Sequence, residues 1–223
     1  ARIRRVELDE GEPLPADRDF THVVVMGGPM GAYDGDRYPW LDLEQRFIRE
    51  VVAAGIPLFG ACLGSQLLAA AMGARVYVAP EPEVGVLAVE LTPQGRADPV
   101  TGGLPERFDT LQWHSDAFDL PAGATLLASS PAYAQQAFRV GETAYAVQFH
   151  LEVTTGMAAE WAAVPAYARA LEAVQGPGAL DRLLADFGAA QDRMQDHART
   201  LIAAWWDHVT PVPAPVSPGP PGP

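Results

Sequence analysis

The feature that most constrains the fold is a glycine-flanked corner, Gly60-Ala61-Cys62-Leu63-Gly64-Ser65-Gln66. An apolar run, Ile56–Phe59, precedes the corner, and a second run of different periodicity, Leu67–Met72, follows it. Glycines two residues before and two residues after Cys62 remove Cβ atoms from the crowded positions of a tight turn. The pattern therefore predicts a strand that turns sharply into a helix, with Cys62 on the corner and its side chain above the sheet edge.

A helix that opens directly behind Cys62 bears on the chemistry of its thiol. The N–H groups of a first helical turn lack intrahelical partners, and they favour the thiolate over the thiol. A lone cysteine is more often a small buried hydrophobic residue, but the paired glycines favour a nucleophile at this position. Cys62 is the only cysteine of the chain, which excludes an internal disulfide and a cysteine-rich zinc site.

The charge balance of the chain excludes several classes of partner. It carries 15 basic and 28 acidic residues, a formal net charge of -13, and such a field repels nucleic acid and anionic membranes. Every basic residue is an arginine, so the lysine of a Walker loop and the lysine of a Schiff base are both missing. The sequence has no run of 18 apolar residues and no signal peptide, and we therefore expect a cytoplasmic protein.

A strand-helix-strand unit is predicted to bring a second loop opposite Cys62. Residues His22–Met26 read as a strand buried on both faces, and Leu41–Ala54 carries apolar residues at helical spacing before Gly55 ends it. Together with the strand before Cys62 they form a βαβ unit of a parallel sheet, in which ligands lie beyond the carboxyl ends of the strands. The loop Gly27–Asp34 should therefore face the Cys62 corner.

Alternating apolar residues predict further strands in the second half of the chain. Two are expected within Arg75–Thr92, at Val76–Val78 and Val84–Leu91, with Pro80 and Pro82 between them. The remaining strands are expected at Thr110–Trp113, Thr125–Ser129, Gln136–Val140 and Ala144–Phe149. The sheet is therefore expected to be mixed.

The C-terminal part is predicted to form helices that cap the core. A helical stripe runs through residues 178–208 and continues after Gly188. Residues 211–223 consist mainly of Pro, Gly and small residues, and they predict a disordered or polyproline-like tail. We expect one domain over residues 1–210 followed by this tail.

A cysteine nucleophile needs a base, and His150 has the best setting among the five histidines. It ends an apolar strand, and Glu152 lies two residues further on, so that both side chains project to the same side of an extended backbone. The alternative is a surface His-x-Glu pair at a strand end. His22 is expected to be structural, and His197 and His208 to be solvated. His114 reads equally well as part of a loop that lines the site and as a polar strand end.

Three sequence blocks together resemble the signature of the class I (triad) glutamine amidotransferases. They are the corner Gly60–Gln66, the upstream Gly27-Gly28-Pro29, and Gln148-Phe149-His150-Leu151-Glu152. Their order and spacing match the family, and the resemblance covers about Phe20–Trp161. It implies an α/β, flavodoxin-like three-layer sandwich with a mixed, mainly parallel central sheet, which hydrolyses the side-chain amide of glutamine.

The resemblance also implies a role for each residue of the motifs. Cys62 corresponds to the nucleophile, His150 to the base and acid, and Glu152 to the group that orients His150. The backbone N–H groups of Gly28 and Leu63 correspond to the oxyanion hole. Three further residues match positions that line the glutamine pocket: Gln66, His114 and Ser115. No metal and no organic cofactor is called for.

The sequence departs from the family pattern in three places. Leu151 replaces a proline that is common in the family, and Met30 replaces a common glycine. In both features the chain resembles a stand-alone branch of the family whose substrate is uncertain. The third departure is at the start, where Ile3–Leu8 reads as a strand and the family's first strand and helix are missing. In a flavodoxin-like order that first strand is central, so Ile3–Leu8 and His22–Met26 should flank a gap. We expect that N-terminal residues are missing or that the gap is filled in another way.

Three functions are compatible with these motifs. The first is a glutaminase subunit that passes ammonia to a separate synthetase, and the second is a hydrolase of γ-glutamyl conjugates with the same three residues. The third, a non-catalytic regulatory domain, is disfavoured by the intact set of motifs. Aromatic residues within Met30–Trp40, together with Trp113, are candidates for docking an acceptor enzyme, although packing over the glutamine pocket is favoured over docking for any one of Tyr33, Tyr38 and Trp40. A homodimer is also compatible with the sequence.

Overall fold

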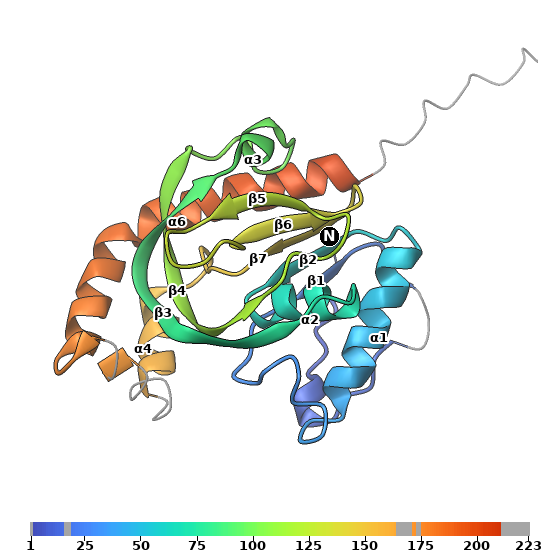
Figure 1. Cartoon of the computed structure of the whole chain (residues 1–223), viewed down its shortest axis with the longest axis horizontal. Coiled ribbons are helices and arrows are strands. Elements are labelled where there is room, and N and C mark those ends of the chain that lie inside the picture. The colour runs from blue at the N-terminus through green and yellow to red at the C-terminus, as the bar shows by residue number, and fades with distance from the viewer. Residues whose placement is uncertain (1, 16–18, 164–170, 173–174, 211–223) are drawn as a thin grey trace, which may run out of the picture.

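The computed structural model describes residues 2–15, 19–163, 171–172 and 175–210. Its centre is a seven-stranded sheet with the strand order β1-β2-β7-β6-β5-β3-β4 (Figure 1). The strands are β1 (Val23–Val25), β2 (Leu58–Ala61), β3 (Val76–Leu91), β4 (Arg107–Phe118), β5 (Thr125–Ser129), β6 (Ala137–Val140) and β7 (Ala144–Val147). The predicted mixed α/β sheet is confirmed.

Parallel pairing is confined to one end of this sheet. Strand β1 pairs with β2, and β2 pairs with β7, both in parallel. The other neighbours among the described strands, β7-β6, β6-β5, β5-β3 and β3-β4, are antiparallel. Parallel pairs are thus a smaller share of the sheet than the sequence led us to expect, because the second half of the chain returns through hairpins rather than through crossover helices.

Helices cover both faces of the parallel end and make three layers. Helices α1 (Trp40–Ala53) and α2 (Leu63–Ala71) lie on one side, and the long α6 (Ala179–Val209) crosses the other (Figure 1). Residues of β2 alternate between these layers, since Leu58 packs in the cluster under α1 and α2 whereas Phe59 packs in the cluster under α6. This two-residue period is why the strand is apolar throughout. Shorter elements are η1 (Leu8–Glu10), α3 (Pro93–Ala97) and α4 (Thr155–Ala163).

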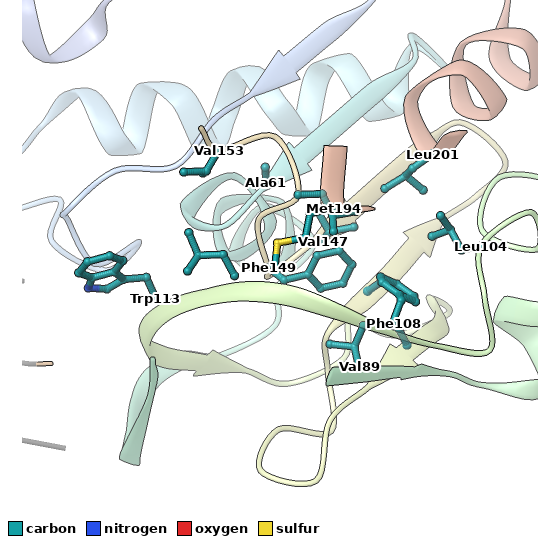
Figure 2. Close-up of a cluster of buried hydrophobic side chains, with 14 of the residues drawn as sticks. Ala61, Val89, Leu104, Phe108, Trp113, Val147, Phe149, Val153, Met194 and Leu201 are labelled. Atoms are coloured by element: carbon teal, nitrogen blue, oxygen red, sulfur yellow. The ribbon is translucent and has the colours of Figure 1, made fainter. Parts of the chain in front are cut away.

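The larger core lies between the sheet and α6. Met194 and Leu201 of α6 point toward Phe108, Val147 and Phe149 (Figure 2). The Phe108 and Phe149 rings meet edge to face with their centroids 5.8 Å apart. Because Phe149 directly precedes His150, this packing fixes the backbone from which the predicted base projects.

The predicted strand at Ile3–Leu8 is wrong. These residues have no strand, Leu8–Glu10 forms a single 3₁₀ turn, and Ile3 is 89% exposed. A strand needs a neighbour for its backbone N–H and C=O groups, and the described residues place none beside this segment. Strand β1 stands at the end of the sheet and pairs only with β2 among the described strands, so the predicted gap between two strands does not form.

Two other boundaries differ from prediction. Strand β3 is continuous from Val76 to Leu91, and the two prolines fall in an irregularity of its pairing with β4 between Val78 and Glu83. The C-terminal helices are one helix of 31 residues that runs through the exposed Gly188, because the buried stripe on the opposite face continues from Phe187 to Ala190 and Met194. Helix α4 was not predicted.

The predicted tail over residues 211–223 lies outside the described residues. Within the described part of the chain, no helix combines the length and the apolar character that crossing a membrane requires.

Glycine substitutions test the packing of α2 on the sheet. A Cβ at Gly64 would lie 2.1 Å from the backbone oxygen of Val25, which cannot move without displacing β1. We expect Gly64→Ala to lower the free energy of unfolding by about 3 kcal/mol or more. The same change at the solvent-facing Gly188 is the matched control, and it should raise stability by about 0.5–1 kcal/mol. Urea unfolding measures both, and equal effects would contradict the packing described here.

Candidate active site

Cys62 occupies a strained corner between β2 and α2. Its backbone angles are φ 53° and ψ -111°, and it is the one non-glycine residue with positive φ in the described part of the chain. Such angles cost roughly 1–3 kcal/mol and persist where neighbours hold them. Here the Cys62 N–H donates to Val147 O over 2.9 Å, and the Ser65 N–H and hydroxyl donate to Cys62 O over 2.9 and 2.7 Å. The predicted strand-to-helix corner is confirmed.

The glycines of the corner are needed for close backbone packing. A Cβ at Gly60 would lie 2.6 Å from Gly64 O, within the corner itself. A Cβ at Gly64 would collide with Val25 of the neighbouring strand. The first contact holds α2 against β2 and the second holds it against the end of β1, which explains why the sequence places glycine on both sides of Cys62.

The loop after β1 faces the corner, as the sequence predicted. An added Cβ at Gly27 would lie 3.3 Å from Cys62 Cβ and 3.4 Å from His150 Cε1. An added Cβ at Gly28 would lie 3.0 Å from Leu63 Cδ2. The two predicted oxyanion-hole residues, Gly28 and Leu63, are therefore neighbours beside the sulfur.

His150 and Glu152 form a close pair at the end of β7. The His150 Nδ1–H donates to Glu152 Oε1 over 2.7 Å, while the Leu151 N–H donates to Glu152 Oε2 over 3.0 Å. The backbone of His150 exchanges two hydrogen bonds with Leu111 of β4, of 2.9 and 3.0 Å. Both oxygens of the Glu152 carboxylate thus accept a hydrogen bond, and the remaining ring nitrogen of His150 is available to Cys62.

Electrostatics favour an ion pair between Cys62 and His150. Burial by itself lowers the pKa of His150, but the charge of the Cys62 sulfur, its hydrogen bond to the ring, and Glu152 outweigh burial and raise this pKa to about 10. Burial also works against ionisation of Glu152, yet the hydrogen bond and positive charge of His150 lower the pKa of Glu152. The arrangement therefore favours the imidazolium form of His150 between Cys62 and Glu152.

These groups open into a pocket of about 330 Å³. Cys62, His150 and Glu152 line it together with the loop that contains Gly27 and Gly28. Its remaining wall is apolar and consists of Met26, Pro29, Trp113, Met157 and Trp161. The Trp161 ring meets the His150 ring edge to face at 4.9 Å, and it meets Trp113 at 6.2 Å.

The three residues predicted to bind glutamine lie outside the described lining of this pocket. Gln66 is buried, and its side-chain amide donates to Gln148 Oε1 over 3.1 Å. The His114 ring is buried between Asp116 O at 3.0 Å and Glu83 Oε2 at 3.2 Å, and Ser115 is exposed. Substrate contacts by these three residues stay a prediction.

Sequence reasoning assigned no role to two side chains next to the predicted nucleophile and base. Gln148 donates through Nε2 to Cys62 Sγ over 3.8 Å, and Trp161 packs on His150. Gln148 had a signal, because it lies two residues before His150 and so projects to the same side of an extended backbone. Trp161 had none, since only the fold brings α4 over the end of β7.

The aromatic residues of the loop after β1 do not line the described pocket. Tyr38 and Trp40 have ring centroids 6.0 Å apart and pack against the cluster under α1 and α2. Tyr33 is half exposed, and its hydroxyl donates to Asp116 Oδ1 over 3.2 Å. Tyr33 is thus the exposed aromatic residue of this loop. The described residues hold no cluster of three or more His, Cys, Asp or Glu side chains suited to a metal ion.

Comparison with known proteins matches the sequence of this chain to a protein family. The sequence profile described as "Glutamine amidotransferase class-I" matches residues 3–161. The glutamine amidotransferase-like protein YfeJ of Salmonella typhimurium is 36% identical over 148 residues, which are 65% of this chain and 62% of YfeJ. A glutamine-hydrolysing GMP synthase of Thermomicrobium roseum is 35% identical over 152 residues, which are 64% of this chain but 27% of the synthase. The chain thus spans less than two thirds of either relative.

Solved structures agree with the sequence comparison. A glutamine amidotransferase from Thermotoga maritima superposes with a TM-score of 0.80 at 33% identity, over 90% of this chain and 84% of that chain. A glutamine amidotransferase from Methylobacillus flagellatus gives a TM-score of 0.79 at 29% identity, over 91% and 83% of the two chains. The flavodoxin-like fold expected from the sequence is confirmed by this likeness.

Alkylation of Cys62 tests the ion pair. A His150 pKa of about 10 keeps the ring protonated through neutral pH, so a positive charge stands beside Cys62 Sγ there and assists its attack on electrophiles. Removing the imidazolium in His150→Ala should slow alkylation by iodoacetamide at least about tenfold near pH 6.5. His208→Ala is the matched control, since His208 is exposed and its ring centroid lies 6.3 Å from that of Tyr145. Equal alkylation rates for His150→Ala and the native protein near pH 6.5 would exclude the pair.

Proposed function

Because the chain belongs to the class I glutamine amidotransferase family, we propose that it hydrolyses the side-chain amide of glutamine through a thioester on Cys62. The observation that carries the proposal is one pocket that holds a cysteine in a strained corner, a buried histidine beside it, and a carboxylate 2.7 Å from that histidine. A nucleophile, a base and an orienting group in this order are what acyl transfer from an amide needs.

In the first half of the reaction, the Cys62 thiolate attacks the amide carbon of glutamine. The oxygen of the tetrahedral intermediate takes up the negative charge, and the backbone N–H groups of Gly28 and Leu63 stabilise it. Each such donor contributes about 10²–10³ in rate. The His150 imidazolium then gives its proton to the amide nitrogen, the C–N bond breaks, and ammonia leaves a γ-glutamyl thioester.

In the second half, the neutral His150 ring takes a proton from a water molecule. The resulting hydroxide equivalent attacks the thioester carbon, the C–S bond breaks, and glutamate leaves while Cys62 returns as the thiolate. Glu152 holds His150 Nδ1–H throughout and stabilises the imidazolium that is present before and after each turnover. Every proton and electron pair is accounted for by these three side chains, glutamine and water.

The ammonia is proposed to serve a separate acceptor enzyme. Relatives of the chain include glutamine-hydrolysing GMP synthases, and the matched region is about a quarter of the synthase of Thermomicrobium roseum. The exposed Tyr33, on the loop that follows the pocket residues Gly27 and Gly28, is a candidate contact for such a partner.

Variants of the three side chains test the assigned roles. We expect Cys62→Ala and His150→Ala to abolish glutamate release from glutamine, because each removes a group that forms or breaks a bond. Glu152→Gln should leave a residual rate, since an orienting group is less essential than the base it orients. His208→Ala serves as the control and should keep the native rate. Small and equal effects of all three changes would contradict the proposed roles.

A second candidate, hydrolysis of γ-glutamyl conjugates of larger amines, is favoured by the apolar wall beside His150. His150 protonates the departing nitrogen, Trp161 packs on His150 and on Trp113, and Met157 lines the same pocket. Ammonia has no apolar surface to bury against such a wall, whereas an alkyl or aromatic amine has.

A panel of amides separates the two candidates. Glutamate release from glutamine should exceed release from γ-glutamyl alkyl and aryl amines if glutamine is the substrate. The opposite order, with a rise of the conjugates' KM in Trp161→Ala and no such rise for glutamine, would establish the conjugate hydrolase instead.

A further inference from the structure

The thioester that the proposed function places on Cys62 can be attacked by nucleophiles other than water. Its carbonyl carbon reacts with any neutral nucleophile that reaches it beside a base. Water attacks this carbon in hydrolysis, and a primary amine attacks it in the same way to give a γ-glutamyl amide. Which nucleophile prevails depends on what the space beside His150 binds best.

The space beside His150 suits an apolar group better than water. Trp161 lies edge to face on the His150 ring at 4.9 Å, and its ring lies 6.2 Å from that of Trp113. Met157, which is 36% exposed, lines the same pocket. The pocket volume of about 330 Å³ is in the range of small-molecule sites, whereas one water molecule takes up only about 30 Å³ in the liquid. An alkyl or aromatic substituent buries apolar surface against this wall, which water cannot do.

Charge selects among the amines that could enter this pocket. Among the described residues that line it there is no arginine, and Glu152 is its one carboxylate. The whole chain carries a formal net charge of -13. An amine that also bears a carboxylate therefore finds no arginine to pair with and is repelled by the field. The sequence contains no lysine, so the amine comes from another molecule.

The acyl-enzyme holds the base that an attacking amine needs. Burial lowers the pKa of His150, while the charge of Cys62 and its hydrogen bond to the ring raise it, together with Glu152. In the thioester the sulfur is bonded to carbon and carries no charge, so both contributions of Cys62 are lost. His150, which has given its proton to ammonia, is then able to take one from the amine. Glu152 still accepts from His150 Nδ1–H over 2.7 Å.

We propose that the protein also transfers the γ-glutamyl group from Cys62 to external primary amines whose substituent is apolar and bears no anionic group. The amine nitrogen forms a bond to the thioester carbon, the C–S bond breaks with its electron pair on sulfur, and His150 takes a proton from the nitrogen. From glutamine and an amine, the sum is a γ-glutamyl amide and ammonia, with no oxidation or reduction. The proposal rests on the proposed function, because it needs the thioester.

The test measures how the thioester partitions between water and amine. The protein turns over glutamine with each n-alkylamine from ethylamine to hexylamine at about pH 9, where more of the amine is neutral than at pH 7. Mass spectrometry quantifies glutamate and the γ-glutamyl alkylamide. Both products arise from one intermediate, so their ratio does not depend on the acylation rate or on the amount of folded protein. Cys62→Ala reports any uncatalysed reaction, and γ-glutamyl p-nitroanilide is a second donor.

The ratio of transfer to hydrolysis should rise about fourfold for each added methylene, which is the effect of burying one CH₂ group. Aminocaproate, which adds a carboxylate to an alkyl chain of similar length, should give at least about tenfold less transfer than hexylamine.

Variants of the apolar wall test where the amine binds. Trp161→Ala should lower the ratio for hexylamine at least about tenfold. Met157→Ser, at an exposed position, should lower it about fourfold and serves if the larger change disturbs folding. Trp206→Ala is the matched control and should keep the native ratio, because Trp206 is partly exposed on α6 and outside the described pocket lining.

A ratio that stays flat along the alkylamine series would overturn the proposal, as would native ratios in both Trp161→Ala and Met157→Ser. Release of glutamate without any γ-glutamyl alkylamide would refute transfer and leave the proposed function standing. Transfer from γ-glutamyl p-nitroanilide by a protein that does not act on glutamine would refute the proposed function and leave transfer standing. A protein whose Cys62 takes a γ-glutamyl group from neither donor would refute both.

Discussion

The structure of the site depends on the close approach of α2 to β1. No side chain fits between Gly64 and the Val25 carbonyl, so the helix start and the strand end are held at backbone contact. This contact sets Cys62 and Leu63 against the loop of Gly27 and Gly28. A larger residue in the corner would separate the sulfur from the N–H groups that are proposed to hold the oxyanion. The cluster under α6 packs on the other face of the sheet and includes Ala61, which directly precedes Cys62.

Burial and charge act together at this corner. His150 is almost fully buried, and burial alone would leave its ring neutral. Cys62 and Glu152 lie on either side of the ring and raise its pKa in favour of the charged form, and a poorly solvated site strengthens both attractions. The same site carries an apolar wall of tryptophan and methionine side chains. The proposed chemistry thus depends on a pair of charges that the protein, rather than solvent, stabilises.

Local patterns in the sequence predicted much of this arrangement, and non-local contacts account for what they missed. The Cys62 corner follows from glycine spacing, and the His150–Glu152 pair follows from alternation along a strand, so both could be predicted. The contact of Gln66 with Gln148 spans 82 residues and depends on sheet register. Whether Ile3–Leu8 forms a strand depends on a neighbour, which no local pattern encodes.

The central claim is that Cys62 carries the acyl group during amide hydrolysis. Acid quenching of the protein during turnover of isotope-labelled glutamine, followed by digestion and mass spectrometry, tests it most directly. The account predicts a glutamyl group on the peptide that contains Cys62, cleaved by hydroxylamine as a thioester is, and absent from Cys62→Ala. Release of glutamate at the native rate by Cys62→Ala, with no adduct on that peptide in the native protein, would contradict it.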